Sequence, residues 1–221
     1  MKKFAVIVAG GSGLRMGTET PKQFLLLNNK PVLWHTIHSF LSTYSDFNII
    51  LVLPQEHLEK GKELQQDFAS VTNNISLVVG GSTRFQSVKN GLALVEENAI
   101  VFVHDGVRCL VSSDLIERCY TQATQLGSAI PAVAATDSIR IVEGNTHAVA
   151  NRNDVRIIQT PQTFLSNILL AAFNQPYQDS FTDEATVVEA TGQQVFLCDG
   201  DYNNIKITRP VDLLVAKSYL E

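Results

Sequence analysis

The stretch that most constrains the fold is a short apolar segment that runs straight into a glycine-rich loop. Phe4 to Val8 is rich in β-branched residues, and an apolar run of this length is typical of a strand buried on both faces of a sheet. Three glycines lie between positions 10 and 13, where they let the backbone bend and bring N–H groups close to an anion. Arg15 and Lys22 then add two positive charges. The combination predicts a cradle for a polyphosphate.

This loop fits neither of two common nucleotide-binding fingerprints. Met16 stands where a dinucleotide-binding loop would have its third glycine, and no Gly-Lys-Ser/Thr sequence follows as in a P-loop. We therefore expect a nucleotide ligand, but neither an NAD enzyme nor a P-loop NTPase. The alternative is a strand-to-helix turn whose glycines only tighten the packing. Such a turn has no need of both Arg15 and Lys22.

The composition predicts a single globular domain spanning residues 1–221, with two smaller domains as the alternative. The chain has 221 residues, 45% of them hydrophobic, and a chain of this size buries roughly 70–75% of its unfolded surface. No stretch approaches the ~20 apolar residues of a membrane span, and Met1-Lys2-Lys3 leaves no room for a cleavable signal. A net charge of -5 argues against nucleic-acid binding. We expect a cytoplasmic protein with no membrane or nucleic-acid partner.

The three cysteines, Cys109, Cys119 and Cys198, have an odd count and no metal-ligand spacing. A disulfide framework is therefore not expected. Cys119 falls in a helical pattern and Cys198 in a strand pattern, and both are interpreted as small core residues.

Strand patterns and helix patterns alternate along the chain. After the first strand, strands are expected at Leu25–Leu27, Asn48–Leu53, Ile75–Val79, Ile100–His104, Ser128–Ala134 and Gln194–Cys198. Helices are expected at Pro31–Leu41, Glu56–Phe68, Phe85–Val95, Asp114–Leu126, Phe164–Phe173, Glu184–Ala190 and Val211–Leu220, with Ser113 and Thr208 as N-caps of the fourth and the last. This alternation predicts an α/β fold with a mostly parallel sheet. Ligands of such sheets bind beyond the carboxyl ends of the strands.

Two of the loops at that edge carry candidate ligand-binding residues. The loop after Val79 begins with two glycines, and Arg84 and Ser87 lie three residues apart, on one face of a first helical turn. The loop is either a pocket for base and ribose or a capped helix start with a surface arginine. The loop after His104 offers Asp105 for a hydroxyl or a divalent cation and Arg108 for a phosphate, unless these two only pair with each other. His104 itself is interpreted as a core or supporting histidine rather than a general base.

The segment Thr136–Arg152 is predicted to be a β-hairpin with a turn at Glu143-Gly144-Asn145. It carries polar residues on both faces, and an isolated hairpin is marginal in water. We expect it to lean on a second subunit, the alternative being an edge hairpin of the same sheet. Arg152 and Thr160 beyond it are candidates for gripping a phosphate. Lys206, between Ile205 and Ile207 in a short predicted strand, is either an edge-strand lysine or an active-site cation.

Taken in order, the motifs resemble one family over nearly the whole chain, Phe4 to Leu220. They are Gly-Gly-x-Gly-x-Arg-Met with Pro-Lys-Gln, Gly-Gly-x-x-Arg-x-x-Ser, His-Asp-x-x-Arg, Arg-Asn with Thr-Pro-Gln, Thr-Asp-Glu-Ala, and Asn-Ile-Lys-x-Thr-x-Pro-x-Asp. The set closely resembles the methylerythritol phosphate cytidylyltransferases of non-mevalonate isoprenoid synthesis. The resemblance implies a single Rossmann-like domain with helices on both faces of the sheet. It also implies reaction of CTP with 2-C-methylerythritol 4-phosphate, with Mg²⁺, to give the CDP-alcohol and pyrophosphate.

The resemblance also implies roles for individual residues. Arg15 and Lys22 would stabilise the α-phosphate and the leaving pyrophosphate, and Arg152 and Lys206 would position the sugar phosphate. Asp105 would be the metal ligand. The remaining candidate binding residues are Ala9, Gly10, Gly11, Ser12, Gly13, Gly81, Ser82, Arg84, Ser87, Asp105, Arg108, Ser138 and Thr160. The hairpin would be a dimerisation arm that reaches into the partner's site, which implies a homodimer with shared active sites.

Three positions depart from the family pattern. Cys109 replaces a usual Pro, Asn203 replaces a frequent acid, and Ser138 replaces a common Thr. Two other functions remain open. A ribitol 5-phosphate cytidylyltransferase shares the fold and the CTP loop, although the Arg152-Asn153 turn looks more like the methylerythritol enzyme. A regulatory nucleotide-binding module without catalysis has no need to keep Arg15 and Lys22.

Overall fold

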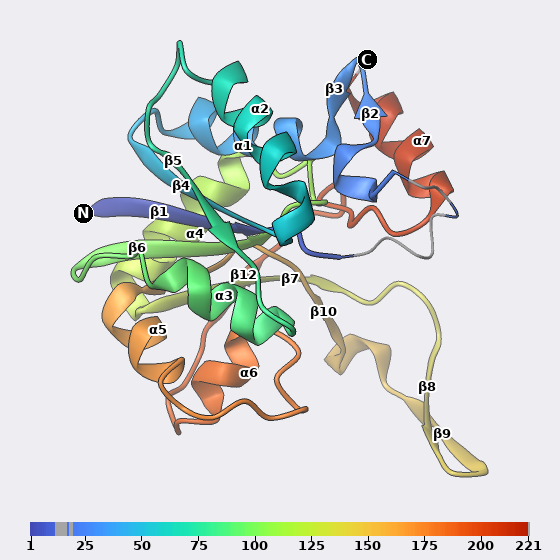
Figure 1. The fold of residues 1–221 in the computed structure, drawn as a ribbon. Helices are drawn as coiled ribbons and strands as arrows, with labels where there is room; N and C mark the ends of the chain where they lie inside the picture. Colours follow the sequence, from blue (N-terminus) through green and yellow to red (C-terminus); the bar gives the residue numbers. More distant parts are fainter. Residues whose placement is uncertain (12–16, 18–19, 221) are drawn as a thin grey trace.

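A mixed eight-stranded sheet forms the centre of the molecule in the computed structural model, which describes residues 1–11, 17 and 20–220 (Figure 1). The strand order is β10-β7-β11-β6-β1-β4-β5, with β12 beside β7. The bounds are β1 Lys2–Val8, β4 Phe47–Leu53, β5 Ile75–Val79, β6 Ala99–Asp105, β7 Ser128–Ala134, β10 Arg156–Ile158, β11 Gln162–Leu165 and β12 Leu197–Asp199. Parallel pairing joins β1 to β4 and β6, and β4 to β5, whereas β11 lies antiparallel between β6 and β7. The predicted α/β fold with a mostly parallel sheet is confirmed.

Helices cover both faces of this sheet, as predicted. One face is packed by α1 (Val32–Thr43), α2 (Leu58–Asp67) and α4 (Ser113–Leu126), and the other by α3 (Arg84–Leu92), α5 (Ser166–Ala172) and α6 (Glu184–Glu189). Successive strand residues point to opposite faces, so Ala5 and Ile7 of β1 enter the first core and Phe4 and Val6 the second. Burial on both faces explains why the strands are continuous apolar runs in the sequence.

A third, smaller core fixes the C-terminal segment to the body. The β2–β3 hairpin (Leu26–Leu27 and Lys30–Pro31) lies beside α7 (Pro210–Tyr219), blue against red in Figure 1. Leu27, Ile207 and Ala216 pack together in this core. The backbone N–H of Ile207 also donates to the carbonyl of Val107 at 3.0 Å. Residues just before α7 are thereby held next to the end of β6.

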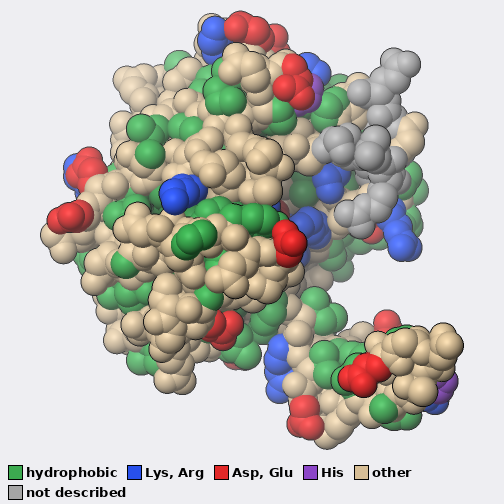
Figure 2. Space-filling model, turned by 60° about the horizontal axis from the view of Figure 1, so that its bottom comes forward, with side chains coloured by type: hydrophobic (Ala, Val, Ile, Leu, Met, Phe, Trp, Pro, Cys, Tyr) green, Lys and Arg blue, Asp and Glu red, His purple; other side chains and the backbone are tan. Residues whose placement is uncertain are grey.

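The predicted hairpin forms an arm that stands off the body (Figures 1 and 2). Its strands are β8 (Ile139–Glu143) and β9 (Thr146–Ala150), and they form a two-stranded sheet of their own. Gly144 in the turn has a φ of +58°, a conformation that favours glycine. Val142 and Val149 are 69% and 71% exposed. The alternative of an edge hairpin on the main sheet is wrong.

Two predicted elements differ in kind from the structure. The stretch Phe164–Phe173 was expected to be all helix, but Phe164 belongs to β11, and α5 begins only at Ser166. Phe164 is fully buried on the sheet, and an apolar run of this length suits a buried strand or a helix equally. The segment around Lys206 is not a strand. Side-chain hydrogen bonds hold it instead, because Asn204 donates to the Thr160 carbonyl at 2.8 Å.

Smaller differences concern the ends of elements. Ser112, not Ser113, caps α4, and Arg209 rather than Thr208 is the N-cap residue of α7. The helix expected to start at Glu56 begins with the 3-10 turn η3 (Gln55–His57), and the last strand is β12 rather than Gln194–Cys198. Two more 3-10 turns are η2 (Lys22–Phe24) and η4 (Arg152–Asp154). Among the helices of the described residues, none has the length and apolar character to cross a bilayer.

Candidate active site

A pocket of about 590 Å³ opens at the carboxyl ends of β1, β5 and β6. The glycine loop after β1 and the two candidate loops after β5 and β6 line it, whereas the loop after β7 leads into the arm. Figure 2 shows Lys and Arg side chains gathered in a recess of the body. The predicted site residues on the pocket wall are Ala9, Gly10, Gly11, Lys22, Gly81, Ser82, Arg84, Ser87, Asp105 and Lys206. Ser12, Gly13 and Arg15 lie outside the described residues.

Lys22 projects from η2 and lines the pocket. Its Nζ donates to the carbonyl oxygen of Ile207 at 2.9 Å, next to Lys206. The neighbouring Gln23 is 1% exposed, and its Nε2 donates to the Ala9 carbonyl at 2.9 Å. The glycine loop, the Lys22 turn and the Lys206 segment are therefore tied to one another. The sequence alone did not single out Gln23 as a supporting residue.

Asp105 at the end of β6 is the centre of a cluster of charges. Its Oδ2 accepts from Lys206 Nζ at 2.8 Å and lies 3.5 Å from Nε of Arg108. Its Oδ1 lies 3.5 Å from Nη2 of Arg84. Arg84 is in turn held by Glu184 of α6 through two hydrogen bonds, and the Glu184 side chain is 1% exposed. The predicted pairing of Asp105 with Arg108 exists, but as part of this larger cluster.

The cluster keeps its central carboxylate ionised. Burial raises the pKa of Asp105, but Arg84 and Lys206 outweigh burial and hold that pKa well below its usual range. Burial also raises the pKa of Glu184, and Arg84 opposes this effect without cancelling it. A permanently charged Asp105 keeps three cations in place around it, and two of them, Arg84 and Lys206, line the pocket, whereas Arg108 does not. A pocket wall with these two cations suits a phosphorylated ligand.

The start of α3 is a capped helix start that also lines the pocket. Thr83 is the N-cap, and its Oγ1 accepts from the N–H of Gln86 at 3.0 Å. Ser87 accepts from the N–H of Gly81 at 3.0 Å and donates to the Thr83 carbonyl at 2.9 Å, which fixes the loop that lines the pocket. Arg84 is not a surface arginine, since Glu184 and Asp105 hold it. The capping interpretation is right for Thr83 and wrong for Arg84.

His104 is a satisfied core histidine, as predicted. It is fully buried, with Nδ1 3.1 Å from Oγ1 of Thr160 and Nε2 3.1 Å from the Arg108 carbonyl. Burial lowers the pKa of His104 to about 4. Thr160 is also buried, and its hydroxyl accepts from the N–H of Asp105 at 3.1 Å. Within this chain Thr160 positions the end of β6, and it does not line the pocket.

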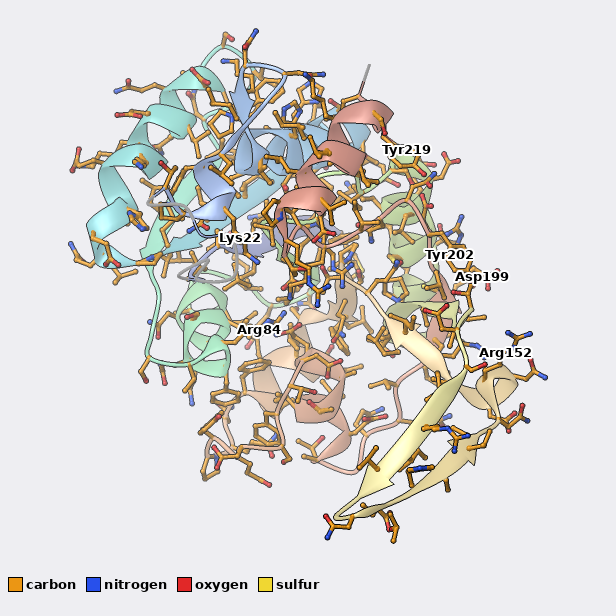
Figure 3. All side chains as sticks on the ribbon, turned by 90° about the vertical axis from the view of Figure 1, so that its right-hand side faces the viewer. Lys22, Arg84, Arg152, Asp199, Tyr202 and Tyr219 are labelled. Carbon is orange, nitrogen blue, oxygen red and sulfur yellow. The ribbon has the colours of Figure 1, made fainter. Side chains whose placement is uncertain are left out.

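Arg152 and Ser138 lie apart from these residues. Figure 3 shows Arg152 at the base of the arm, whereas Lys22 and Arg84 lie on the body. Arg152 is exposed and donates to the Thr136 carbonyl at 2.9 Å. Neither Arg152 nor Ser138 lines the pocket of its own chain.

The sequence profile of the 2-C-methyl-D-erythritol 4-phosphate cytidylyltransferases matches residues 4–221. The chain belongs to this family. A relative of that name from Bacteroides fragilis is 44% identical over 220 residues, which cover 100% of both chains. One from Porphyromonas gingivalis is 45% identical over 222 residues, covering 99% of this chain and 98% of the relative. The crystal structure of the 4-diphosphocytidyl-2C-methyl-D-erythritol synthase from Anaerococcus prevotii superposes with a TM-score of 0.83 at 28% identity, covering 99% and 97%.

Members of this cytidylyltransferase family are nucleotidyltransferases, so the predicted enzyme class is confirmed. A magnesium ion fits this site only together with phosphate ligands. Among the described residues no group of three or more His, Cys, Asp or Glu side chains could hold a metal. Asp105 and Glu56 each place a carboxylate on the pocket wall, and Mg²⁺ is commonly held by one or two carboxylates plus substrate phosphates.

Proposed function

We propose that this chain transfers the cytidylyl group of CTP to 2-C-methyl-D-erythritol 4-phosphate, giving 4-diphosphocytidyl-2-C-methylerythritol and pyrophosphate. The observation that carries the proposal is the pocket in which the glycine loops after β1 and β5 meet Lys22, Asp105 and Lys206. Backbone N–H groups and lysines together are the standard means of holding a polyphosphate. The names of the full-length relatives supply the nucleotide and the acceptor.

In this reaction an oxygen of the acceptor's phosphate attacks the α-phosphorus of CTP. A new P–O bond forms there, and the bond to the β-phosphate oxygen breaks, so the electron pair leaves with pyrophosphate. The attacking phosphate is already ionised and needs no protein base, which agrees with a neutral, fully buried His104. Lys22, with Arg15 as its expected partner, neutralises charge on the α-phosphate and the leaving group.

Lys206 is proposed to bind the phosphate of the acceptor, with Arg108 holding Asp105 beside it. Both cations contact Asp105, but Lys206 lines the pocket and is 41% exposed, whereas Arg108 does not line the pocket. A bound phosphate would share Lys206 with Asp105. We further propose that Asp105 and the CTP phosphates hold Mg²⁺, which supplies additional neutralisation of the triphosphate charge.

The expected homodimer is part of this proposal. The pocket of one chain lacks Arg152 and Ser138, and the arm that carries them exposes Val142 and Val149. Exposed apolar side chains on a self-standing hairpin favour burial against another surface. A partner's arm would add Arg152 and Ser138 to the site. The expected cytoplasmic location stays a prediction.

The direct test is release of pyrophosphate from CTP and Mg²⁺, run in parallel with 2-C-methylerythritol 4-phosphate and ribitol 5-phosphate. Release with the first acceptor alone is the expected result. Release with ribitol 5-phosphate alone would show that the enzyme is a ribitol 5-phosphate cytidylyltransferase. No release with either acceptor, from protein that binds CTP, would overturn catalysis and favour a binding module.

A further inference from the structure

Two of the three free cysteines are in contact between α4 and β12. The Sγ of Cys119 on α4 lies 3.8 Å from the Sγ of Cys198 on β12, although 79 residues separate them in sequence. Cys119 is fully buried, while Cys198 is partly exposed. The third cysteine, Cys109, is buried in the small core beside α7. Only the first two thiols are therefore in contact, and one of them can be reached from solvent.

The surroundings favour reaction at Cys198. Arg118, next to Cys119 on α4, donates to the Asp199 carbonyl at 2.7 Å. The hydrogen bond with Cys119 lowers the pKa of the Cys198 thiol, burial opposes this, and Arg118 lowers it further. The same contact and burial raise the pKa of Cys119. A partly exposed thiol with more thiolate character beside a buried second thiol is the arrangement of a reactive cysteine and its resolving partner.

The strand that carries Cys198 can move more easily than the helix that carries Cys119. β12 has three residues and, among the described strands, pairs only with β7, with side-chain bonds from Arg118 and Gln122 to its carbonyls, whereas α4 spans 14 residues and packs into the main core. A disulfide needs the sulfur atoms about 2.05 Å apart, so closing the gap would draw β12 toward α4.

Movement of β12 would be passed to the active site. The chain leads from Cys198 through Asp201 and Asn204 to Lys206. Asp201 exchanges two hydrogen bonds with Gln159, at 2.8 and 3.1 Å, and Asn204 is bonded to both Thr160 and Arg108 at 2.8 Å. Gly200 leaves little slack, since an added Cβ there would lie 2.6 Å from Oε1 of Gln159. The segment is therefore held tightly against the residues that position Asp105.

We propose that Cys119 and Cys198 form a reversible oxidation site, at which a peroxide converts the two thiols to a disulfide that displaces the Lys206 segment and slows turnover. The Cys198 thiolate attacks one oxygen of hydrogen peroxide, which gives a sulfenic acid and, after proton uptake, water. The Cys119 sulfur then attacks the sulfenic sulfur, the S–S bond forms, and the hydroxide that leaves takes up the thiol proton as a second water. Two electrons pass from the thiols to the peroxide.

The first test measures the modification without any assay of activity. Reduced protein is treated with hydrogen peroxide, its free thiols are titrated under denaturing conditions, and its peptides are mapped by mass spectrometry without reductant. The free thiols should fall from the three of the reduced chain to one, with a peptide pair joined through Cys119 and Cys198. Cys109→Ala should form the same Cys119–Cys198 disulfide, which leaves it no free thiol, and Cys198→Ser should form no disulfide. In the wild type, sulfinic acid at Cys198 without a disulfide would overturn the proposal. The Cys119→Ala variant lacks the second thiol, so it should give sulfinic acid at Cys198.

The second test measures the consequence. Hydrogen–deuterium exchange should rise in residues 199–206 of the oxidised protein and return to its former level after reduction with dithiothreitol. The effect on rate rests on the proposed function. Turnover should fall by ~10-fold or more on oxidation and recover with dithiothreitol, because small misplacements of positioning groups are costly. Exchange and turnover that stay unchanged in fully disulfide-bonded protein would overturn the coupling to Lys206. An inactive reduced enzyme would contradict the proposed function alone, since exchange and thiol counts need no substrate.

Discussion

The carboxylate of Glu184 accepts hydrogen bonds from both terminal nitrogens of the Arg84 guanidinium, although 100 residues separate the two in sequence. Glu184 comes from the first turn of α6 and Arg84 from the first turn of α3. The same guanidinium also contacts Asp105, since Nη2 of Arg84 lies 3.5 Å from Oδ1 of Asp105. Glu184 therefore positions the guanidinium that keeps Asp105 ionised, while Asp105 holds Lys206 at the pocket.

Replacing Glu184 with Gln should destabilise the protein by about 3 kcal/mol, because it leaves the Arg84 charge without its buried partner. The free energy of unfolding in urea measures this loss. Arg84 should then compete with Lys206 for Asp105, so the KM for the sugar phosphate should rise in the folded variant. The matched control is Glu96→Gln, which removes an exposed pair with Lys2 and should cost less than about 1 kcal/mol. Equal losses in the two variants would contradict the role given to Glu184.

Removing the ammonium group of Lys22 should affect the chemical step more than nucleotide binding. We expect Lys22→Ala to lower kcat by ~10²–10³, as for loss of one charge-stabilising donor, while CTP still binds. Pyrophosphate release and calorimetric titration with CTP measure the two effects separately. Lys60→Ala is the control, because Lys60 lies over the ring of Phe24 on the same side of the molecule and does not line the pocket. An unchanged kcat would remove Lys22 from the mechanism.

The buried His104 predicts a pH dependence of stability. Burial lowers its pKa from 6.5 to about 4 in the folded protein, so between these values the unfolded chain binds the proton more tightly. Stability is fully present above pH 6.5 and is lost as the pH falls toward 4. From pH 7 to pH 5 the free energy of unfolding should fall by about 2 kcal/mol from this group. Urea titrations at pH 7 and pH 5 measure this change in the free energy of unfolding. In His104→Gln the change between the two pH values should be smaller by about 2 kcal/mol. The same difference in the variant would assign the dependence to other groups.

The strands and pocket loops were predictable because their determinants are local. The β-branched run before Gly10 and the pair Gly80-Gly81 each specify an element without distant contacts. Other features depend on contacts between residues far apart in the sequence, which the sequence pattern does not reveal. Asp183 caps α6 through its own neighbours, since it accepts from the N–H of Thr186, whereas Glu184 beside it is the partner of Arg84 only because the fold brings the start of α6 to the start of α3. Likewise Ile205 and Ile207 suggest a strand, but Asn204 fixes that segment by side-chain bonds to Thr160.

The arm leads to a prediction about where each active site obtains its residues. Arg152 lies at the arm's base, apart from Lys22 of the same chain, so a shared site must take Arg152 from the partner subunit (Figure 3). Lys22→Ala and Arg152→Ala should each inactivate the enzyme when present in both chains. In a dimer of one chain of each kind, one of the two sites has both side chains intact. Random exchange of subunits makes about half of the dimers mixed, so the mixture should recover about one quarter of the wild-type activity. Pyrophosphate release before and after exchange measures the recovery, and sedimentation checks that dimers are present. If each chain used its own Arg152, no site in the mixed dimer would be complete, and activity would stay at the level of the separate variants.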